Sequence, residues 1–291
     1  MTRFVVVPQW QGSPSARAMQ LVDGAEAIAG DLPRQRTMRV EVPASAGESL
    51  DTGIRRLSSL LRARDALGDA LDRTDATGSP DAEDPSPADP RSAEPVIVVG
   101  GDCGVAVPAI AHAAARHDLL AVVWFDAHGD LHTPDSSPSG AFAGMALRAV
   151  VEPLPLSAAD AGGRVSPDRV VLAGARELDP PERAALAETG IAHLGVDDLA
   201  DAGALVALLA GSGATAVHIH VDLDVLDPAV ISGVASPVPF GLSLDDLVGA
   251  IRAVRTVLPL AGASIAGFAP ASPAAAVDDL GTILRVVGAL A

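Results

Sequence analysis

The chain has 291 residues, of which 37 are acidic and 20 are basic, so its formal net charge is −17. This charge argues against nucleic acid or an anionic membrane surface as a partner. Hydrophobic residues make up 49% of the chain, enough for a large core, but no apolar run has the length of a signal peptide or a membrane span. The only cysteine, Cys103, excludes an internal disulfide framework and leads us to expect a cytoplasmic protein.

Short apolar segments with strand character alternate with helical segments along the chain. Strands are expected at residues 4–7, 38–42, 96–99, 120–125, 170–173, 191–194, 217–221 and 264–268. Helices are expected at residues 16–29, 47–72, 105–117, 142–151, 180–188, 198–209, 244–254 and 275–290. This alternation predicts an α/β fold, with a parallel sheet of eight strands covered by helices on both faces.

The segment at residues 74–95 interrupts the pattern. It reads TDATGSPDAEDPSPADPRSAEP, is rich in Pro, Asp, Ser and Ala, and has almost nothing to bury. Such a composition is typical of a disordered surface insertion. Because strands and helices alternate in the same way on both sides of it, we expect a single domain over residues 1–291 with a disordered acidic insertion at 74–95.

Acidic side chains follow two of the expected strands. Asp126, His128 and Asp130 are spaced by two residues after the strand at 120–125, and alternate residues of an extended chain point to the same side. Asp222 and Asp224 repeat the spacing after the strand at 217–221. A lone Asp in such a place is usually a helix cap, but two clusters beyond the carboxyl ends of parallel strands can meet at one site. Several carboxylates with an imidazole suit a cation such as Mn²⁺ or Mg²⁺.

Several short runs, taken together, resemble the ureohydrolase family, which includes arginase, agmatinase and formimidoylglutamase. They are Gly100-Gly101-Asp102, FDAHGDLHTP from Phe125, Ser139-Gly140 with Gly144-Met145, GARELDPPE from Gly174 and HVDLDVLDP from His220. In order and spacing they fit the whole chain. The resemblance implies a three-layer arginase-like α/β fold around an eight-stranded parallel sheet, and a homo-oligomer, commonly a trimer or hexamer.

The resemblance also implies a centre with two Mn²⁺ ions that share a bridging hydroxide, which attacks a guanidinium-type carbon. Asp126 and Asp222 would bridge the two ions, Asp130 would bind one of them, and His128 and Asp224 would bind the other. Two cations make such a hydroxide available at neutral pH because they lower the pKa of the water that they bind. Asp130 would also be catalytic, by holding and relaying the proton.

Three further residues match positions at which arginases contact the substrate, namely His132, Ser139 and Asp179. Each has an alternative structural interpretation. His132 would be an exposed loop histidine, Ser139 part of a Ser-Gly turn, and Asp179 the N-cap of a helix that begins at Pro180.

At three positions the chain departs from the family pattern. Cys103 stands where the family has a metal-binding His, so it either binds a metal as a thiolate or is an unligated buried thiol. Ala143 replaces a proton-shuttling His, and Pro270 replaces a Glu that grips the guanidinium group. His220, two residues before Asp222, either supplies the missing imidazole or is a buried strand histidine with a hydrogen-bond partner.

The main hypothesis is a manganese-dependent hydrolase of a C–N bond in a small guanidino, modified guanidino or amidino compound. The missing His and Glu motivate an alternative, a catalytically inactive arginase-like protein that serves as a binding or regulatory subunit. A third idea, a nucleotide-binding doubly wound protein, starts from Gly100-Gly101, but no complete G-x-G-x-x-G follows these residues.

Overall fold

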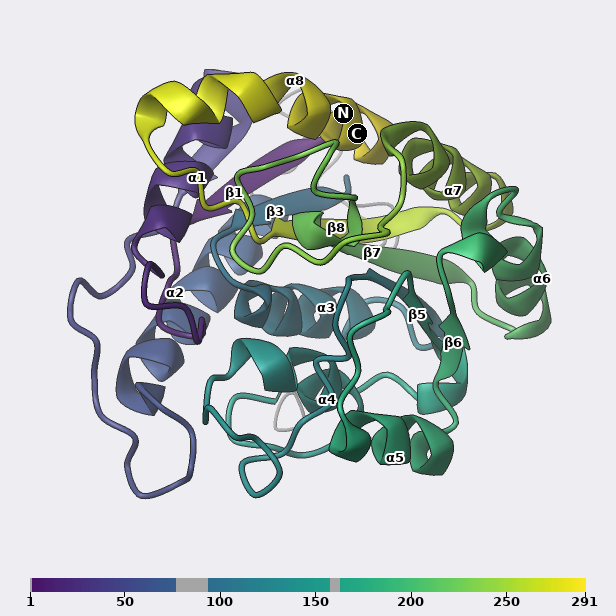
Figure 1. Cartoon of the computed structure of the whole chain (residues 1–291), viewed down its shortest axis with the longest axis horizontal. Helices are drawn as coiled ribbons and strands as arrows, with labels where there is room; N and C mark the ends of the chain where they lie inside the picture. Colours follow the sequence, from purple (N-terminus) through teal and green to yellow (C-terminus); the bar gives the residue numbers. More distant parts are fainter. Residues whose placement is uncertain (1, 77–93, 158–162) are drawn as a thin grey trace.

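The strands form one sheet in which all neighbours run parallel. The computed structural model describes residues 2–76, 94–157 and 163–291, and within these ranges the sheet has eight strands in the order β2-β1-β3-β8-β7-β4-β5-β6 (Figure 1). This confirms the predicted eight-stranded parallel sheet. The strands are β1 (Arg3–Val7), β2 (Thr37–Arg39), β3 (Val96–Gly100), β4 (Leu120–Phe125), β5 (Val170–Ala173), β6 (Ala192–Leu194), β7 (Ala216–Asp222) and β8 (Leu260–Ala266).

Helices cover both faces of the sheet, which makes the three layers of the expected α/β fold (Figure 1). Along one face α1 packs on α8, α8 on α7 and α7 on α6, and along the other α2 packs on α3 and α3 on α4. Figure 1 places α5 beside α4. The helices are α1 (Gln20–Gly30), α2 (Leu57–Ala76), α3 (Ala106–Ala114), α4 (Ala146–Val151), α5 (Pro180–Thr189), α6 (Gly203–Gly211), α7 (Leu244–Val257) and α8 (Pro273–Leu290).

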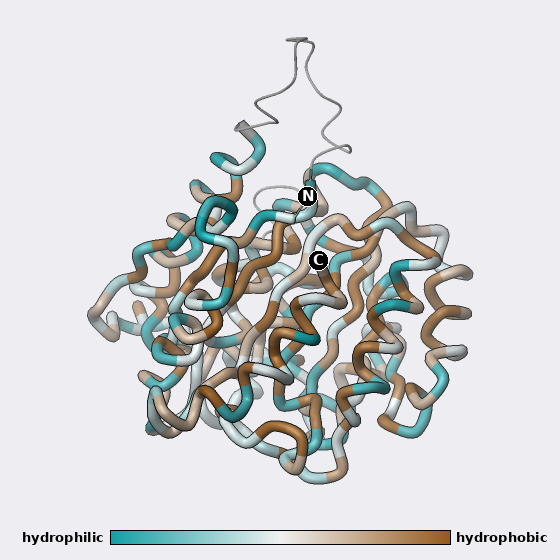
Figure 2. The backbone as a smooth tube through the Cα atoms, turned by 90° about the horizontal axis from the view of Figure 1, so that it is seen from above, coloured by the Kyte–Doolittle hydropathy of each residue, from teal (hydrophilic) through white to brown (hydrophobic). Residues whose placement is uncertain are grey.

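Successive side chains of a strand point to opposite faces of the sheet, which explains why helices must cover both faces. Phe4 and Val6 of β1 belong to the hydrophobic cluster that contains Ile28 of α1, whereas Val5 and Val7 belong to the cluster that contains Leu67 of α2. Buried parallel strands of this kind are apolar throughout rather than alternating. Figure 2 shows hydrophobic and hydrophilic residues mixed along the covering helices, as expected for helices with one face on a sheet.

Several element boundaries differ from those expected, and at two of them, the start of α2 and the end of β8, glycines with positive φ angles explain the difference. The helix expected from residue 47 begins at Leu57, because the chain before it turns through positive φ angles, which include 83° at Gly47 and 77° at Gly53. Strand β8 ends at Ala266 rather than at residue 268. Gly267 follows with φ 87°, and a Cβ atom there would collide with the carboxylate of Asp222. A glycine therefore lets this segment pass close to the candidate site.

The insertion expected at residues 74–95 lies largely outside the described residues, which leave out 77–93; residues 74–76 form the end of α2. The single domain stays a prediction. Thr2 Oγ1 donates to the carbonyl of Ala291 at 3.1 Å, so the two ends of the chain lie together (Figure 1). None of the helices in the described ranges has both the length and the hydropathy that crossing a bilayer would require.

The order of the strands decides where polar side chains can gather. The four central strands are β3, β8, β7 and β4, and they end at Gly100, Ala266, Asp222 and Phe125. Because the strands are parallel, these four ends lie at the same edge of the sheet. The segments that follow them carry the residues of the candidate site.

Candidate active site

A cavity of about 240 Å³ lies at this edge of the sheet. It brings together six of the metal-ligand candidates of the sequence, from the carboxyl ends of β3, β4 and β7, whereas His220 is not part of its lining. The ligand candidates in its lining are Cys103, Asp126, His128, Asp130, Asp222 and Asp224.

Asp126, His128 and Asp224 form one group of ligand atoms that lie within 4.8 Å of one another. His128 Nδ1 is 3.1 Å from Asp224 Oδ2 and 3.3 Å from Asp126 Oδ1. Burial works against a charged imidazole, but the bonds to the two carboxylates outweigh it and raise the pKa of His128 to about 12. His128 Nδ1 thus faces two carboxylates, and the three side chains offer ligand atoms close enough together to hold a cation.

The other carboxylates are buried at high electrostatic cost. Burial, followed by repulsion from neighbouring carboxylates, raises the pKa of Asp130 and Asp222 well above the ordinary value of 3.8, and that of Asp224 is raised as well. Asp130 Oδ2 has no hydrogen-bond partner in the described part of the chain. Crowded carboxylates with an unsatisfied oxygen are stabilised by a divalent cation, so these residues fit a metal centre.

The backbone holds these carboxylates in place. His128 N–H donates to Asp126 Oδ1 at 2.7 Å, and Ala127 N–H donates to Asp224 Oδ1 at 3.1 Å. Asp130 has φ 53°, in the left-handed region that Asp tolerates better than most residues. The alternation of side chains expected for an extended chain therefore does not continue beyond Phe125. The chain bends there instead, and Asp130 lines the cavity.

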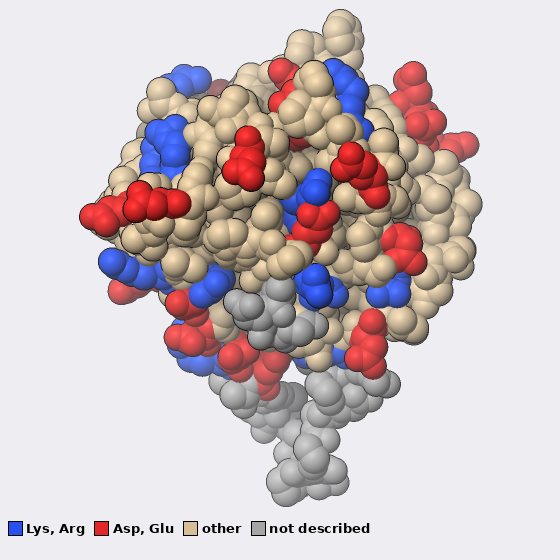
Figure 3. All heavy atoms as spheres, turned by 90° about the horizontal axis from the view of Figure 1, so that it is seen from below, with Lys and Arg blue, Asp and Glu red and all other residues tan. Residues whose placement is uncertain are grey.

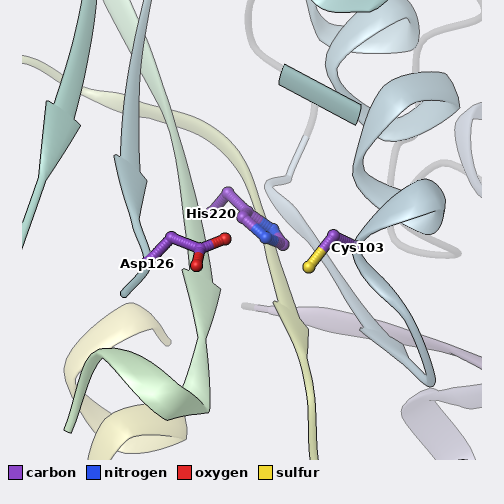
Figure 4. A group of neighbouring side chains, drawn as sticks. All are labelled: Cys103, Asp126 and His220. Atoms are coloured by element: carbon purple, nitrogen blue, oxygen red, sulfur yellow. The ribbon is translucent and has the colours of Figure 1, made fainter. Parts of the chain in front are cut away.

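Cys103 lies in the turn after β3 and is buried. Its Sγ donates a hydrogen bond to Asp222 Oδ2 at 2.8 Å, and burial together with the nearby carboxylates raises the pKa of the thiol well above 9.0. A second group of ligand atoms within 4.8 Å of one another joins Cys103 to Asp126 and His220. Figure 4 shows the His220 ring between the other two side chains.

His220 has features of both interpretations given above. Its Nδ1 lies 2.8 Å from Ser264 Oγ, as expected for a strand histidine with a partner. Its Nε2, however, is buried and has no hydrogen-bond partner among the described residues. Burial lowers the pKa of His220 to about 3, so the ring is neutral and one nitrogen lone pair is available.

The substrate-binding candidates do not all lie in one place. His132 and Asp179 both line the cavity, and His132 Nε2 is 3.2 Å from Asp179 Oδ2. Asp179 is also the N-cap of α5, as its alternative interpretation expected. Ser139 is not among the residues that line the cavity; its Oγ accepts a hydrogen bond from Ala141 N–H at 3.2 Å.

Glu182 and Trp124 also belong to the site, and the sequence alone did not single them out. Glu182 is buried, lines the cavity and forms a capping box with Asp179. The Asp-x-x-Glu spacing is the sequence signal that could have identified it. Trp124 Nε1 donates to Asp126 Oδ2 at 3.0 Å from beneath the site, a contact for which the sequence carries no signal.

Asp102, in the same turn as Cys103, is another member of the lining. It accepts hydrogen bonds from Gln9 Nε2, Gly12 N–H and Gly104 N–H, at 2.9, 2.9 and 3.0 Å. Burial raises its pKa to about 6, although these bonds oppose the shift. Asp102 thus ties the turn after β3 to the segment after β1, and so positions Cys103.

Of the departures from the family pattern, Ala143 lines the cavity, whereas Pro270 is buried and is not part of that lining. The carboxylates of the cavity would repel phosphate groups, which argues against the nucleotide-binding alternative.

Fold and site together define a parallel α/β protein with an acidic, cation-suited cavity at the carboxyl ends of its strands. A family model described as Arginase family matches residues 64–280. The arginase of Bacillus subtilis (strain 168) is 36% identical over 154 residues, which cover 50% of this chain and 52% of that protein. The arginase of Bacillus caldovelox is 30% identical over 223 residues, 74% of this chain and 67% of that protein. The chain belongs to the arginase family.

A comparison of structures extends the likeness to the whole fold. The crystal structure of Entamoeba histolytica arginase in complex with L-ornithine matches with a TM-score of 0.81 at 21% identity, over 99% of this chain and 97% of that one. In sequence, by contrast, this chain spans only about half the length of the Bacillus subtilis relative.

Proposed function

We propose that this chain is a metal-dependent hydrolase of a C–N bond in a guanidino, modified guanidino or amidino compound, with two Mn²⁺ ions as cofactor. The observation that carries the proposal is the burial of Asp126, Asp130, Asp222 and Asp224 in one cavity with His128. Ionised carboxylates this close together repel one another unless cations balance them, and oxygen-rich ligand sets suit manganese. When bound, such ions supply positive charge that makes water acidic and polarises a C=N group.

The residues of the chain have distinct roles in this proposal. Asp126 belongs to two groups of ligand atoms, one with His128 and Asp224 and one with Cys103 and His220. In this proposal Asp126 and Asp222 would hold both ions, His128 and Asp224 would hold one of them, and Asp130 would hold the other. Asp130 has an oxygen without a partner in the described structure and a raised pKa, so it can hold a proton and pass it to a leaving amine. No titratable side chain stands at Ala143 to share this task.

One group of residues in the cavity lining indicates which substrates fit. His132 and Asp179 face each other in it, with Glu182 beside them. Their donors and acceptors can bind a polar group at the far end of a small substrate. Because Pro270 offers no carboxylate, the guanidinium charge would lack one anchor, which favours a modified guanidine or an amidine over an unmodified guanidinium group.

The proposed location and partners of the enzyme rest on its charge and composition, and the proposed oligomer rests on the resemblance to the arginase family. We infer a cytoplasmic homo-oligomer, a trimer or hexamer, with a small molecule as substrate and neither nucleic acid nor membrane as partner. In support, acidic side chains lie among the basic ones over the face seen in Figure 3, without one large basic patch.

The test is hydrolysis of a panel of amidino and guanidino compounds by the Mn²⁺-loaded chain, with release of urea, ammonia or amine as the readout. Asp126→Ala should abolish turnover, whereas Asp227→Asn, a change at a carboxylate outside the cavity, should preserve it. No turnover of any compound by a chain that binds two metal ions would reject the proposal and favour the inactive binding or regulatory subunit.

A further inference from the structure

The two sides of the candidate centre differ in ligand chemistry. Asp126, His128 and Asp224 offer two carboxylates and one imidazole. Cys103, Asp126 and His220 offer a thiol, a carboxylate and an imidazole, and all three residues are buried. Sulfur and imidazole ligands favour zinc, whereas carboxylates favour manganese.

His220 provides the observation that distinguishes this group from a lone buried cysteine. Its Nε2 is buried without a partner among the described residues, while its ring packs on Trp124 with centroids 3.9 Å apart. A buried nitrogen without a hydrogen bond costs free energy. A cation beside Cys103 and Asp126 would satisfy it (Figure 4).

The hydrogen bonds on the Nδ1 side of the His220 ring suit a role as a metal ligand. Ser264 Oγ lies 2.8 Å from His220 Nδ1 and 3.2 Å from His218 Nε2. If His220 Nδ1–H donates to Ser264 and the Ser264 hydroxyl donates to His218, Nε2 of His220 carries no proton and its lone pair is free to bind a metal. Partners of this kind orient the imidazole ligands of metal centres and set their tautomer.

The spacing of the group is close to that of a bound ion. Ligand bonds of about 2.0–2.3 Å around a tetrahedral zinc place the ligand atoms within about 4 Å of one another. The ligand atoms of Cys103, Asp126 and His220 already lie within 4.8 Å. Asp222, whose Oδ2 accepts the hydrogen bond from Cys103 Sγ, would complete the set once zinc replaces the thiol proton.

We propose that Cys103, His220 and Asp126, with Asp222, form a zinc-selective subsite of the metal centre, in which His220 supplies the imidazole that is absent at position 103. The proposal rests on the proposed function, because it assigns one of the two ions of that centre to zinc. The chain would then hold one zinc and one manganese rather than two manganese ions.

The first experiment is a titration of the metal-free full chain with Co²⁺, an optical substitute for zinc. The native chain should develop a near-ultraviolet thiolate-to-metal charge-transfer band, and Cys103→Ser should remove it. His220→Asn retains a polar group near Ser264 but lacks Nε2, and should weaken zinc binding by about tenfold or more. His193→Asn, the same change at an exposed histidine of β6, should bind zinc as the native chain does.

A second measurement does not depend on whether the variants fold. X-ray absorption at the zinc edge of the native chain should show one sulfur neighbour at about 2.3 Å. Dialysis of the zinc-loaded chain against excess Mn²⁺ should leave one equivalent of zinc. Absence of the cobalt band, absence of a sulfur neighbour or complete exchange for manganese would each overturn the proposal.

The same samples separate this inference from the proposed function. Turnover by the Mn²⁺-loaded chain without any cobalt–thiolate band would overturn the zinc subsite and leave the hydrolase intact. A cobalt–thiolate band and a retained zinc ion, without turnover of any amidino compound, would support the subsite and reject the hydrolase.

Discussion

His132 Nε2 and Asp179 Oδ2 lie 3.2 Å apart in the lining of the acidic cavity, so these two candidates for substrate binding are each other's partners. We expect His132→Asn to release the Asp179 carboxylate from the position in which it binds an amino group, and so to raise KM for substrates with that group by about tenfold, the worth of one charge-assisted hydrogen bond. Asp179→Asn should raise KM for the same substrates. Steady-state kinetics on matched substrates with and without the amino group would check this; equal KM changes for both would contradict it.

Asp130→Asn tests the proton-holding role. Asn tolerates the positive φ of this position, so the fold should persist. Loss of one acid–base group should lower kcat by about 10²–10⁴-fold at saturating metal. The measurement is kcat together with metal content, because a fall in both would indicate a ligand rather than a proton carrier. An unchanged kcat would exclude the role.

The metal-free chain should become less stable as the pH rises. The pKa values of Asp130, Asp222 and Asp224 are raised above 3.8 by burial and by neighbouring carboxylates, so the folded state binds their protons more tightly than the unfolded state. Their contribution to stability is therefore present below pH 3.8 and is lost as the pH rises through the raised pKa values. The lowered pKa of Asp126 opposes part of this trend, as do those of His218 and His220, which burial lowers to about 3, so the fall in stability should be clearest above pH 6.5.

Thermal unfolding of the metal-free chain as a function of pH would measure the effect. Saturating Mn²⁺ should reverse the fall in Tm, since cations favour the charged carboxylates. Asp222→Asn should make the metal-free profile flatter. A Tm that rises with pH above pH 6.5 in the absence of metal would show that the carboxylates are not held as described.

Trp124→Phe removes the N–H that donates to Asp126 Oδ2. Loss of a group that orients a metal ligand typically costs 10–100-fold in metal affinity, and we expect a loss of about that size. Trp10→Phe is the matched control, because Trp10 packs against Arg56 and is not part of the cavity lining. Metal titrations of both variants would decide; equal affinities would show that the hydrogen bond has no effect.

Arg176 holds the segment that carries Asp224. Its guanidinium donates to the carbonyls of Asp224 and Val238 at 2.9 and 2.6 Å, and further to those of Gly174, Val225 and Pro239. The single ammonium group of a Lys side chain cannot donate to all these carbonyls at once. Arg176→Lys should therefore lower the free energy of unfolding by about 2–3 kcal/mol. Arg183→Lys, at an exposed arginine of α5, should change it little. Chemical denaturation of both variants provides the comparison.

Much of the fold could be predicted because the apolar periods are local. Each of the eight observed strands overlaps an expected one, and the gathering of Asp126 and Asp222 at one edge of the sheet was expected because both follow parallel strands. The start of α2 and the end of β8 could not be predicted. They depend on positive φ angles at Gly47, Gly53 and Gly267, which are set by what each glycine approaches in space.

The sequence by itself determined the alternation of strands and helices, the family resemblance and four of the carboxylates that line the cavity, namely Asp126, Asp130, Asp222 and Asp224. It left open what Cys103 and His220 contact, and it did not single out Glu182 or Trp124. Only the tertiary structure shows that ligand atoms of Cys103, Asp126 and His220 lie within 4.8 Å of one another, that Glu182 lines the cavity and that Trp124 donates to Asp126. The physical reason is that ligand geometry depends on side chains far apart in the chain, and no local pattern records which atom of a buried ring has no partner.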